Sequence, residues 1–363
     1  MSGADTLRSA GAGVMTVARL EFRLRIRAGR WRWMVAAWFV LLLAITGLVR
    51  ASLTERNLSR DQVQARGAVM FGVVMLIVLA LALLVSPALA AQSVNGDRER
   101  GTLATLQVTR LRPGEIAVGK LLASWGTALV FLAVTLPLAL WCFAEGGLSV
   151  LRVFGVYLVT TLLLGVICSL ALGLSALLAR STTSGVLAYL TVFALSVGTF
   201  IAFGLATVLT QEHAKASSVS CSYDENGNEV PGSCVKQEYE ASVPRTDRTW
   251  WLLAPNPFAV LADSAPAGPT REIRQPDGRV VEEGVSLDPL GAMSRALHQI
   301  RVKPTLQDNG LSTFYDVPDG VVGSSVWPTG LIIDLLLGAG ALWLTARRLR
   351  TPTYKLARGQ RIA

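Results

Sequence analysis

The chain has 363 residues, of which 52% are hydrophobic and only 16% are charged, and its formal net charge is +9. This composition argues against a soluble enzyme, because soluble domains hold about 25% charged residues. Six apolar segments are near the length of about 20 residues that a membrane-spanning helix needs. The sequence therefore predicts an all-α polytopic membrane protein with six transmembrane helices, at Trp33–Leu48, Ala68–Ala91, Leu121–Phe143, Val153–Leu178, Gly185–Leu209 and Pro328–Thr345. No cleaved signal peptide is expected, because the first apolar run starts only after some thirty residues.

Basic residues gather in the first 32 residues, in the connection between the second and third spans, and in residues 347–363. Short cytoplasmic segments of membrane proteins carry an excess of Lys and Arg. We therefore expect a protein of the plasma membrane with both termini and the second connection in the cytoplasm. The first connection, which holds Arg50, Arg56, Arg60 and Arg66, would face outside against this trend. We assign the positive charge to topology and to anionic lipid, and expect no nucleic-acid partner.

The first 32 residues permit two interpretations. Residues 20–27 alternate between apolar and charged side chains, which is typical of a strand. Arg19, Arg23 and Arg27 also form one helical stripe opposite Val17 and Leu20. A lone strand beside a bilayer would leave its backbone unpaired, so we predict a cytoplasmic amphipathic helix that lies in the membrane interface.

The fourth span repeats small residues every four positions, at Gly165, Ser169 and Gly173. Small residues at this spacing allow two helices to approach closely. They indicate either close packing within the chain or a seam between two copies.

Residues 211–327 lack long apolar runs and predict a small α+β extracellular module between the fifth and sixth helices. Disulfides persist in oxidising compartments, so we predict a bond between Cys221 and Cys234. Turn signals at Asn226-Gly227 and at residues 275–278 each indicate a pair of strands. Asp288 precedes Pro289 and is predicted to cap a helix that reaches Ile300.

The segment Trp250–Phe258 is rich in aromatic residues and interrupted by proline. It either dips into the outer leaflet, where aromatic rings are favoured, or forms part of the core of the module.

No catalytic residue, bound cofactor or metal site is expected in this chain. Gly114–Leu121 approaches the phosphate-loop pattern, but Leu121 stands where that loop needs a hydroxyl for magnesium. His213 and His298 are the only histidines, and they are far apart without clustered carboxylates.

Asp334 is a charged residue within the sixth predicted span, about 10 Å from its start at ~1.5 Å per residue. Ionisable residues in spans cost several kcal/mol and face a cavity or a partner. Asp334 is therefore a candidate for a substrate path, and the alternative is a structural hydrogen bond to another helix or to water.

Residues 92–120 connect the second and third spans and are predicted to hold a short docking helix for a cytosolic protein. Charged residues precede a helix with an apolar face, and acidic groups suit the positive end of a helix dipole. The candidate docking residues are Asp97, Arg98, Glu99, Arg100, Gly101, Thr102, Leu103 and Leu106.

This connection resembles that of permeases of type-2 ATP-binding-cassette (ABC) transporters. The similarity lies in Glu99–Leu103, Pro113, Glu115-Ile116 and Gly119–Leu122, and Asn256–Phe258 before the last span adds to it. The resemblance implies that residues 92–120 contain the coupling helix, which docks on a cytosolic ABC ATPase. It further implies an exporter with a second permease chain, identical or homologous, and with ATP and magnesium bound by the ATPase rather than by this chain.

The alternative function is a non-transporting membrane anchor or sensor whose extracellular module binds a ligand or a partner.

Overall fold

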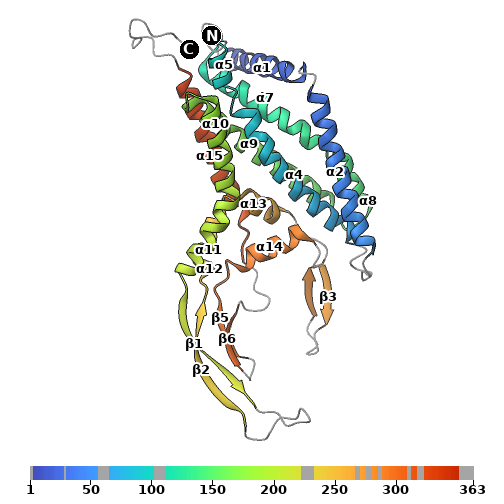
Figure 1. Ribbon diagram of the computed structural model, residues 1–363, viewed down its shortest axis with the longest axis vertical. Coiled ribbons are helices and arrows are strands. Elements are labelled where there is room, and N and C mark those ends of the chain that lie inside the picture. The colour runs from blue at the N-terminus through green and yellow to red at the C-terminus, as the bar shows by residue number, and fades with distance from the viewer. Residues whose placement is uncertain are drawn as a thin grey trace.

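The computed structural model describes residues 3–27, 30–55, 65–101, 111–221, 233–265, 270–274, 280–284, 288–308, 312–316 and 323–350. Among them, six helical stretches are long and apolar enough to cross a membrane, which confirms a mostly helical polytopic protein. Figure 1 shows these stretches packed into one bundle, with α1 and the end of α15 at one end of it and strands at the other. The helices of the bundle are α1 (Gly3–Arg27), α2 (Arg30–Glu55), α4 (Arg66–Ala90), α5 (Asn95–Glu99), α7 (Pro113–Ala133), α8 (Leu136–Ala144), α9 (Val150–Leu177), α10 (Ser181–Phe193), η1 (Ala194–Gly198), α11 (Thr199–Leu209) and α15 (Trp327–Arg348).

The first helix, α1, lies across the end of the bundle (Figure 1). Its alternating residues 20–27 belong to this helix and not to a strand. Val17 is buried, and Gly119 of α7 leaves space for it, since a side chain at Gly119 would overlap Val17. Leu20 and Leu24 are exposed, so α1 packs one face on α7 and leaves these two apolar side chains open.

Two of the spans are interrupted along their length. The third span consists of α7 and α8, and the break comes directly before Pro137, whose ring carries no N–H for a continuous helix. The fifth span changes to a π-helix, η1, over Ala194–Gly198 between α10 and α11. Such π-turns concentrate at functional sites in helices.

Small residues bring α9 against its neighbours within the chain. A side chain at Gly165 would meet the indole of Trp125, and one at Gly173 would meet Ala341 of α15. Gly338 of α15 packs in turn on Val166 of α9. The stripe of small residues in the fourth span therefore serves packing within the chain, as the first of the two interpretations expected.

The region between α11 and α15, here called the interspan region, combines helices with two small sheets. A four-stranded sheet has the order β2-β1-β6-β5, and β3 pairs with β4 in a separate hairpin. Cys221 and Cys234 form a disulfide at the far end of the β1–β2 pair. The turns predicted at residues 226–227 and 275–278 lie outside the described residues, but the strands that flank them pair as expected. The strands are β1 (Glu212–Ser220), β2 (Val235–Val243), β3 (Thr270–Arg274), β4 (Val280–Gly284), β5 (Thr305–Asp308) and β6 (Ser312–Asp316).

The aromatic segment Trp250–Phe258 follows α12 (Thr246–Thr249) directly and passes through η2 (Trp250–Leu252) into α13 (Pro257–Ser264). Asn256 is fully buried and joins this segment to the fifth span. Its side-chain oxygen accepts hydrogen bonds from the backbone amides of Phe258 and Ala259. Its side-chain nitrogen donates to the backbone carbonyl of Ser196 in η1 at 2.6 Å. The segment is therefore mostly core, although the Trp251 side chain is exposed.

Asp288 does not cap its helix, contrary to our prediction. It stands directly before α14 (Pro289–Gln299), but its side chain makes no cap hydrogen bond. Instead, one oxygen accepts a hydrogen bond from the Arg152 guanidinium at 2.6 Å, and both side chains are 2% exposed or less. A buried arginine needs a partner more than a helix end needs a cap, so this ion pair fastens the interspan region to α9.

The start of α15 is held by the interspan region as well. The Asp263 carboxylate at the end of α13 accepts hydrogen bonds from the amides of Val326 and Trp327, at 2.6 and 2.8 Å. Gly330, one turn later, touches the backbone at Ala254, where an added methyl group would overlap the carbonyl oxygen.

Gly330→Ala is expected to destabilise the protein by about 1–3 kcal/mol, the usual cost of overpacking, because α15 must move away from Ala254. Gly340→Ala on the same helix is the matched control, since nothing lies within 4 Å of a methyl group there. Thermal unfolding of both purified variants in lipid nanodiscs measures the effect. A Gly330→Ala protein as stable as the Gly340→Ala protein would contradict the close approach.

Candidate functional site

The predicted docking segment begins at α5, a five-residue helix that follows the second span. It lies at the same end of the bundle as α1 (Figure 1). Gly101 ends the described part of the segment with a φ of 70°, a conformation that favours glycine. Thr102, Leu103 and Leu106 lie outside the described residues.

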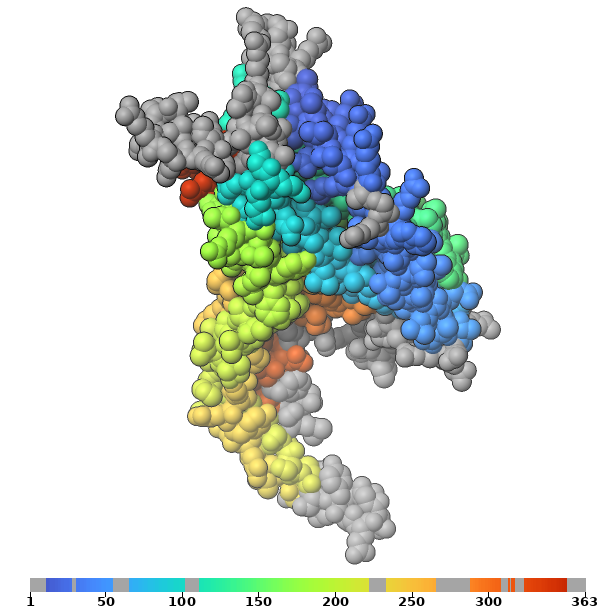
Figure 2. All heavy atoms as spheres, turned by 45° about the horizontal axis from the view of Figure 1, so that its top comes forward, coloured from blue at the N-terminus to red at the C-terminus, as the bar shows by residue number. Residues whose placement is uncertain are grey.

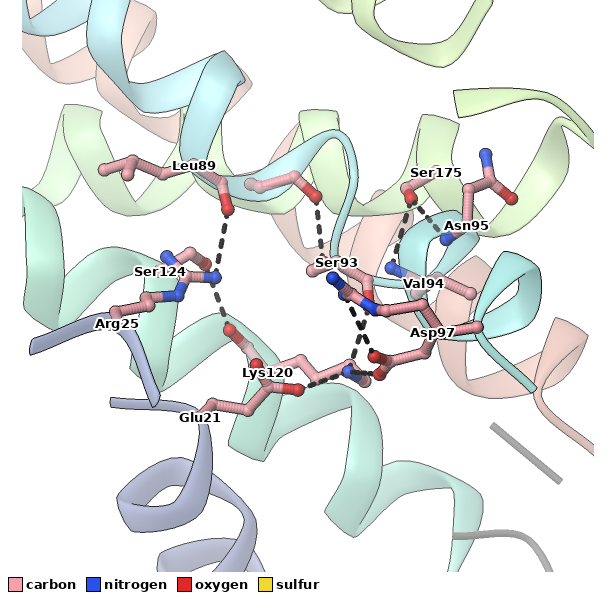
Figure 3. A network of polar contacts seen from close by, with 12 residues as sticks. Glu21, Arg25, Leu89, Ser93, Val94, Asn95, Asp97, Lys120, Ser124 and Ser175 are labelled. Atoms are coloured by element: carbon pink, nitrogen blue, oxygen red, sulfur yellow. Dashed lines mark hydrogen bonds and ion pairs between the residues drawn. The ribbon is translucent and has the colours of Figure 1, made fainter. Parts of the chain in front are cut away.

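Lys120 of α7 is the centre of a buried polar network beneath α5 (Figure 3). Its ammonium group is completely buried and has three acceptors: the Glu21 carboxylate at 2.5 Å, the Ser93 carbonyl at 2.9 Å and the Asp97 carboxylate. An ammonium group has three N–H donors, so each donor of Lys120 has an acceptor. The three acceptors come from α1, from the turn after α4, and from α5. One side chain therefore holds three elements against α7.

Ser175 of α9 holds the other side of α5. Its hydroxyl oxygen accepts hydrogen bonds from the amides of Val94 and Asn95, both at 3.2 Å. These amides open α5 and have no partner within the helix. Ser175 therefore replaces the cap that the local sequence lacks (Figure 3).

Two charged side chains of α5 reach the connection between α9 and α10. Arg98 donates to the Leu178 carbonyl at 3.1 Å, and Glu99 accepts from the Ser181 amide at 3.3 Å. Ser184 of α10 adds a bond to the Ala91 carbonyl at 2.9 Å. The segment 91–99 is thus bound to both the fourth and the fifth spans.

Arg25 of α1 contacts the end of α4. Its guanidinium donates to the Leu89 carbonyl at 3.0 Å, and this carbonyl belongs to the last turn of the helix, where acceptors have no helical donor. A cation also suits the negative end of the α4 dipole. Together with Glu21, Arg25 makes α1 part of the network rather than a helix that only rests on the membrane surface (Figure 3).

The predicted docking residues divide into two groups. Asp97 and Arg98 are partly buried and face the bundle, whereas Glu99, Arg100 and Gly101 are exposed. Among the described residues that form ion pairs, Arg100 has the most exposed side chain, at 72%. In Figure 2 the cyan surface of this part of the chain is visible between the blue surface of α1 and the green surface of α10. A partner protein can therefore touch Glu99–Gly101 while Asp97 and Arg98 connect the contact to the bundle.

Sequence reasoning singled out the charged residues from Asp97 as docking residues, but it placed the helix after them, at residues that lie outside the described ones, and did not predict α5. It named Lys120 only as a basic residue of this connection and within two motif matches, and it did not single out Glu21 and Ser175. A lysine inside a segment of high hydropathy was the available signal, because a buried ammonium requires acceptors.

The rejected phosphate-loop match is explained by the same lysine. Gly114–Leu121 is part of helix α7, and Lys120 is occupied by carboxylates and a carbonyl. Among the described residues, no group of three or more His, Cys, Asp or Glu side chains could hold a metal ion.

Asp334 lies inside α15 and is 2% exposed. Neither carboxylate oxygen has a hydrogen-bond partner among the described residues. Gly330 and Gly338, one turn before and one turn after, place Asp334 on the face of α15 that packs on α13 and α9. The described residues of the other helices therefore make no hydrogen bond to Asp334, and the bond to a water stays a prediction.

Lys120→Met is expected to lower the free energy of unfolding by roughly 3 kcal/mol, the low end for breaking a buried ion pair. The low end applies because Glu21 and Asp97 remain partly exposed, at 19% and 13%. Lys215→Met, at an exposed lysine of β1, is the control and should change little. Thermal unfolding of the purified proteins measures both, and equal midpoints would exclude Lys120 as the centre of the network.

Comparison with known proteins places this arrangement in a family. The model of the ABC-2 family transporter protein family matches residues 15–240, which is more than half of the chain. The match runs from α1 through the docking segment and the first five spans to β2. No curated protein matches the chain. The chain is a multi-pass membrane protein and belongs to the ABC-2 transporter family.

Proposed function

We propose that this chain is the membrane-spanning permease subunit of an ATP-driven ABC exporter. A separate cytosolic ATPase would bind at α5 and the residues after it, and its hydrolysis of ATP would drive substrate out of the cell or out of the inner leaflet. Family membership supports the permease role. The single observation that supports coupling is the attachment of α5 to the bundle through Lys120 and Ser175.

The contacts of α5 explain how a docked protein would act on the membrane part. A push on the exposed residues Glu99–Gly101 reaches α7 and α1 through Lys120, and reaches α9 through Ser175. Charge-assisted and buried hydrogen bonds transmit such displacement because breaking them is costly. One short helix would therefore move several spans together.

The proposed assembly contains a cytosolic ABC ATPase, a second permease chain (identical or homologous) and membrane lipid. ATP and magnesium would be bound by the ATPase, and this chain would have no nucleotide site of its own. We propose no nucleic-acid partner, because the net charge of +9 fits membrane topology.

We further propose that α5 and both termini are cytoplasmic in the plasma membrane and that the interspan region lies outside. Arginines close the last turn of α15 at the α5 end, as expected for a cytoplasmic exit. The Cys221–Cys234 disulfide is part of the other end, and disulfides persist outside the cytosol.

Asp334 is our candidate for the substrate path. A carboxylate buried in a span without a partner among the described residues is unfavourable, which supports a role for Asp334 in transport. Movement of α15 against α9 and α13 during transport would bring this group into contact with substrate or water.

Arg100→Glu should release the ATPase, since it reverses the charge of an exposed docking side chain. Arg248→Glu is the control: this arginine is also exposed and ion-paired, but it lies in the interspan region. Co-purification from membranes measures retention of an ATP-hydrolysing partner. A complex that survives both substitutions counts against docking at α5, and an absence of any ATPase from the wild-type preparation favours an anchor or sensor.

Asp334→Asn should lower the amount of substrate moved per ATP hydrolysed, because the amide cannot ionise when the path opens. Thr345→Val on the same helix is the control, since the Thr345 hydroxyl only bonds the Ala341 carbonyl of its own helix. Proteoliposomes that contain the whole complex measure both rates. Unchanged stoichiometry in Asp334→Asn would remove this residue from the path.

A further inference from the structure

A recess of about 490 Å³ opens where α1, the start of α7 and the end of α15 meet. Its apolar wall consists of one residue from each helix, Val14, Val118 and Ala346. Because α15 ends at Arg348, the recess lies at the end of the last candidate span. A lipid in the adjacent leaflet can reach this level with its headgroup.

The rim of the recess is basic. Arg112 and Arg350 line it from two different elements, and both side chains are exposed. Glu115, the acidic residue of the lining, accepts a hydrogen bond from the Arg112 amide at 3.1 Å and so faces the start of its own helix. The two guanidinium groups and the one carboxylate therefore leave a net positive charge at the mouth of the recess.

The backbone at the start of α7 leaves room for an anion. Pro113 has no N–H, so Gly114 supplies the first amide of this 21-residue helix. Nothing lies within 4 Å of the position that a side chain on Gly114 would take. Helix N-termini attract anions, and here the open approach coincides with two arginines.

We propose that the recess binds the phosphate headgroup of an anionic phospholipid, with the adjoining part of the lipid on the apolar wall. Basic pockets between spans bind such headgroups. A free phosphate would use only the arginines and the amide, whereas most of the recess is apolar. The proposed orientation assigns the lipid to the inner leaflet, and binding itself does not depend on that orientation.

The site has a consequence for coupling, which rests on the proposed function. The bound lipid touches α1 and α7, the two helices that Glu21 and Lys120 join beneath α5. A headgroup in the recess would stabilise this junction, so ATPase coupling would respond to the anionic lipid content of the membrane.

The test uses the full chain in nanodiscs of phosphatidylcholine with or without phosphatidylglycerol. Native mass spectrometry counts retained phosphatidylglycerol, and thermal unfolding reports its effect. Arg112→Gln/Arg350→Gln should weaken retention by roughly tenfold to thirtyfold, from ~1 kcal/mol per arginine. The matched control is Arg19→Gln/Arg23→Gln, which removes two exposed arginines of α1 outside the recess.

Selective loss in the recess variant supports the site. Equal retention by the recess variant and the wild type would overturn it, and so would equal loss in both variants, which indicates general surface attraction. Soluble glycerol phosphate is the third arm: if it raises the unfolding midpoint as much as phosphatidylglycerol, the ligand is a free phosphate and the lipid assignment is wrong. None of these arms requires the ATPase, so failure here is distinguishable from failure of the proposed function.

Discussion

The buried ammonium of Lys120 is the interaction on which the α5 end of the protein depends. It brings carboxylates from α1 and α5 and a carbonyl from the turn after α4 to one point of α7. Burial makes this group decisive, because an ammonium without acceptors in an apolar bundle costs several kcal/mol. Moving α5 would break the buried contact of Asp97 with Lys120, so this contact keeps the exposed Glu99–Gly101 surface in a fixed relation to the spans.

The other end of the bundle uses the same physical device with different residues. Arg152 of α9 and Asp288 form a buried ion pair, and Asp263 binds the first amides of α15. Asn256 adds a bond to the π-turn of the fifth span. The interspan region is consequently joined to the fourth, fifth and sixth spans. Buried polar contacts thus join the spans at both ends of the bundle.

Hydropathy was sufficient to predict six spans, because length and apolar character decide whether a helix can cross a bilayer. Local turn chemistry was sufficient for the pairing of β1 with β2 and of β3 with β4. Asp288 shows where local rules fail: its position favours a cap, but a distant buried arginine is the stronger partner. Pro137 is itself a local signal for the break in the third span, but the sequence analysis did not divide the span there. No local signal in the sequence identified the partners of Lys120, since Glu21, Ser93 and Asp97 meet only after α1 folds across the bundle.

The central claim is that the exposed tip of α5 receives a separate ATPase. A photoreactive amino acid at position 100, introduced into the full chain in native membranes, tests this contact most directly. A second preparation with the same group at Glu238, an exposed position of β2, measures background. We expect light-dependent attachment of an ATP-binding chain to position 100 and none to position 238. Attachment at position 238 alone, or at neither position in membranes that contain the assembled complex, would contradict the account.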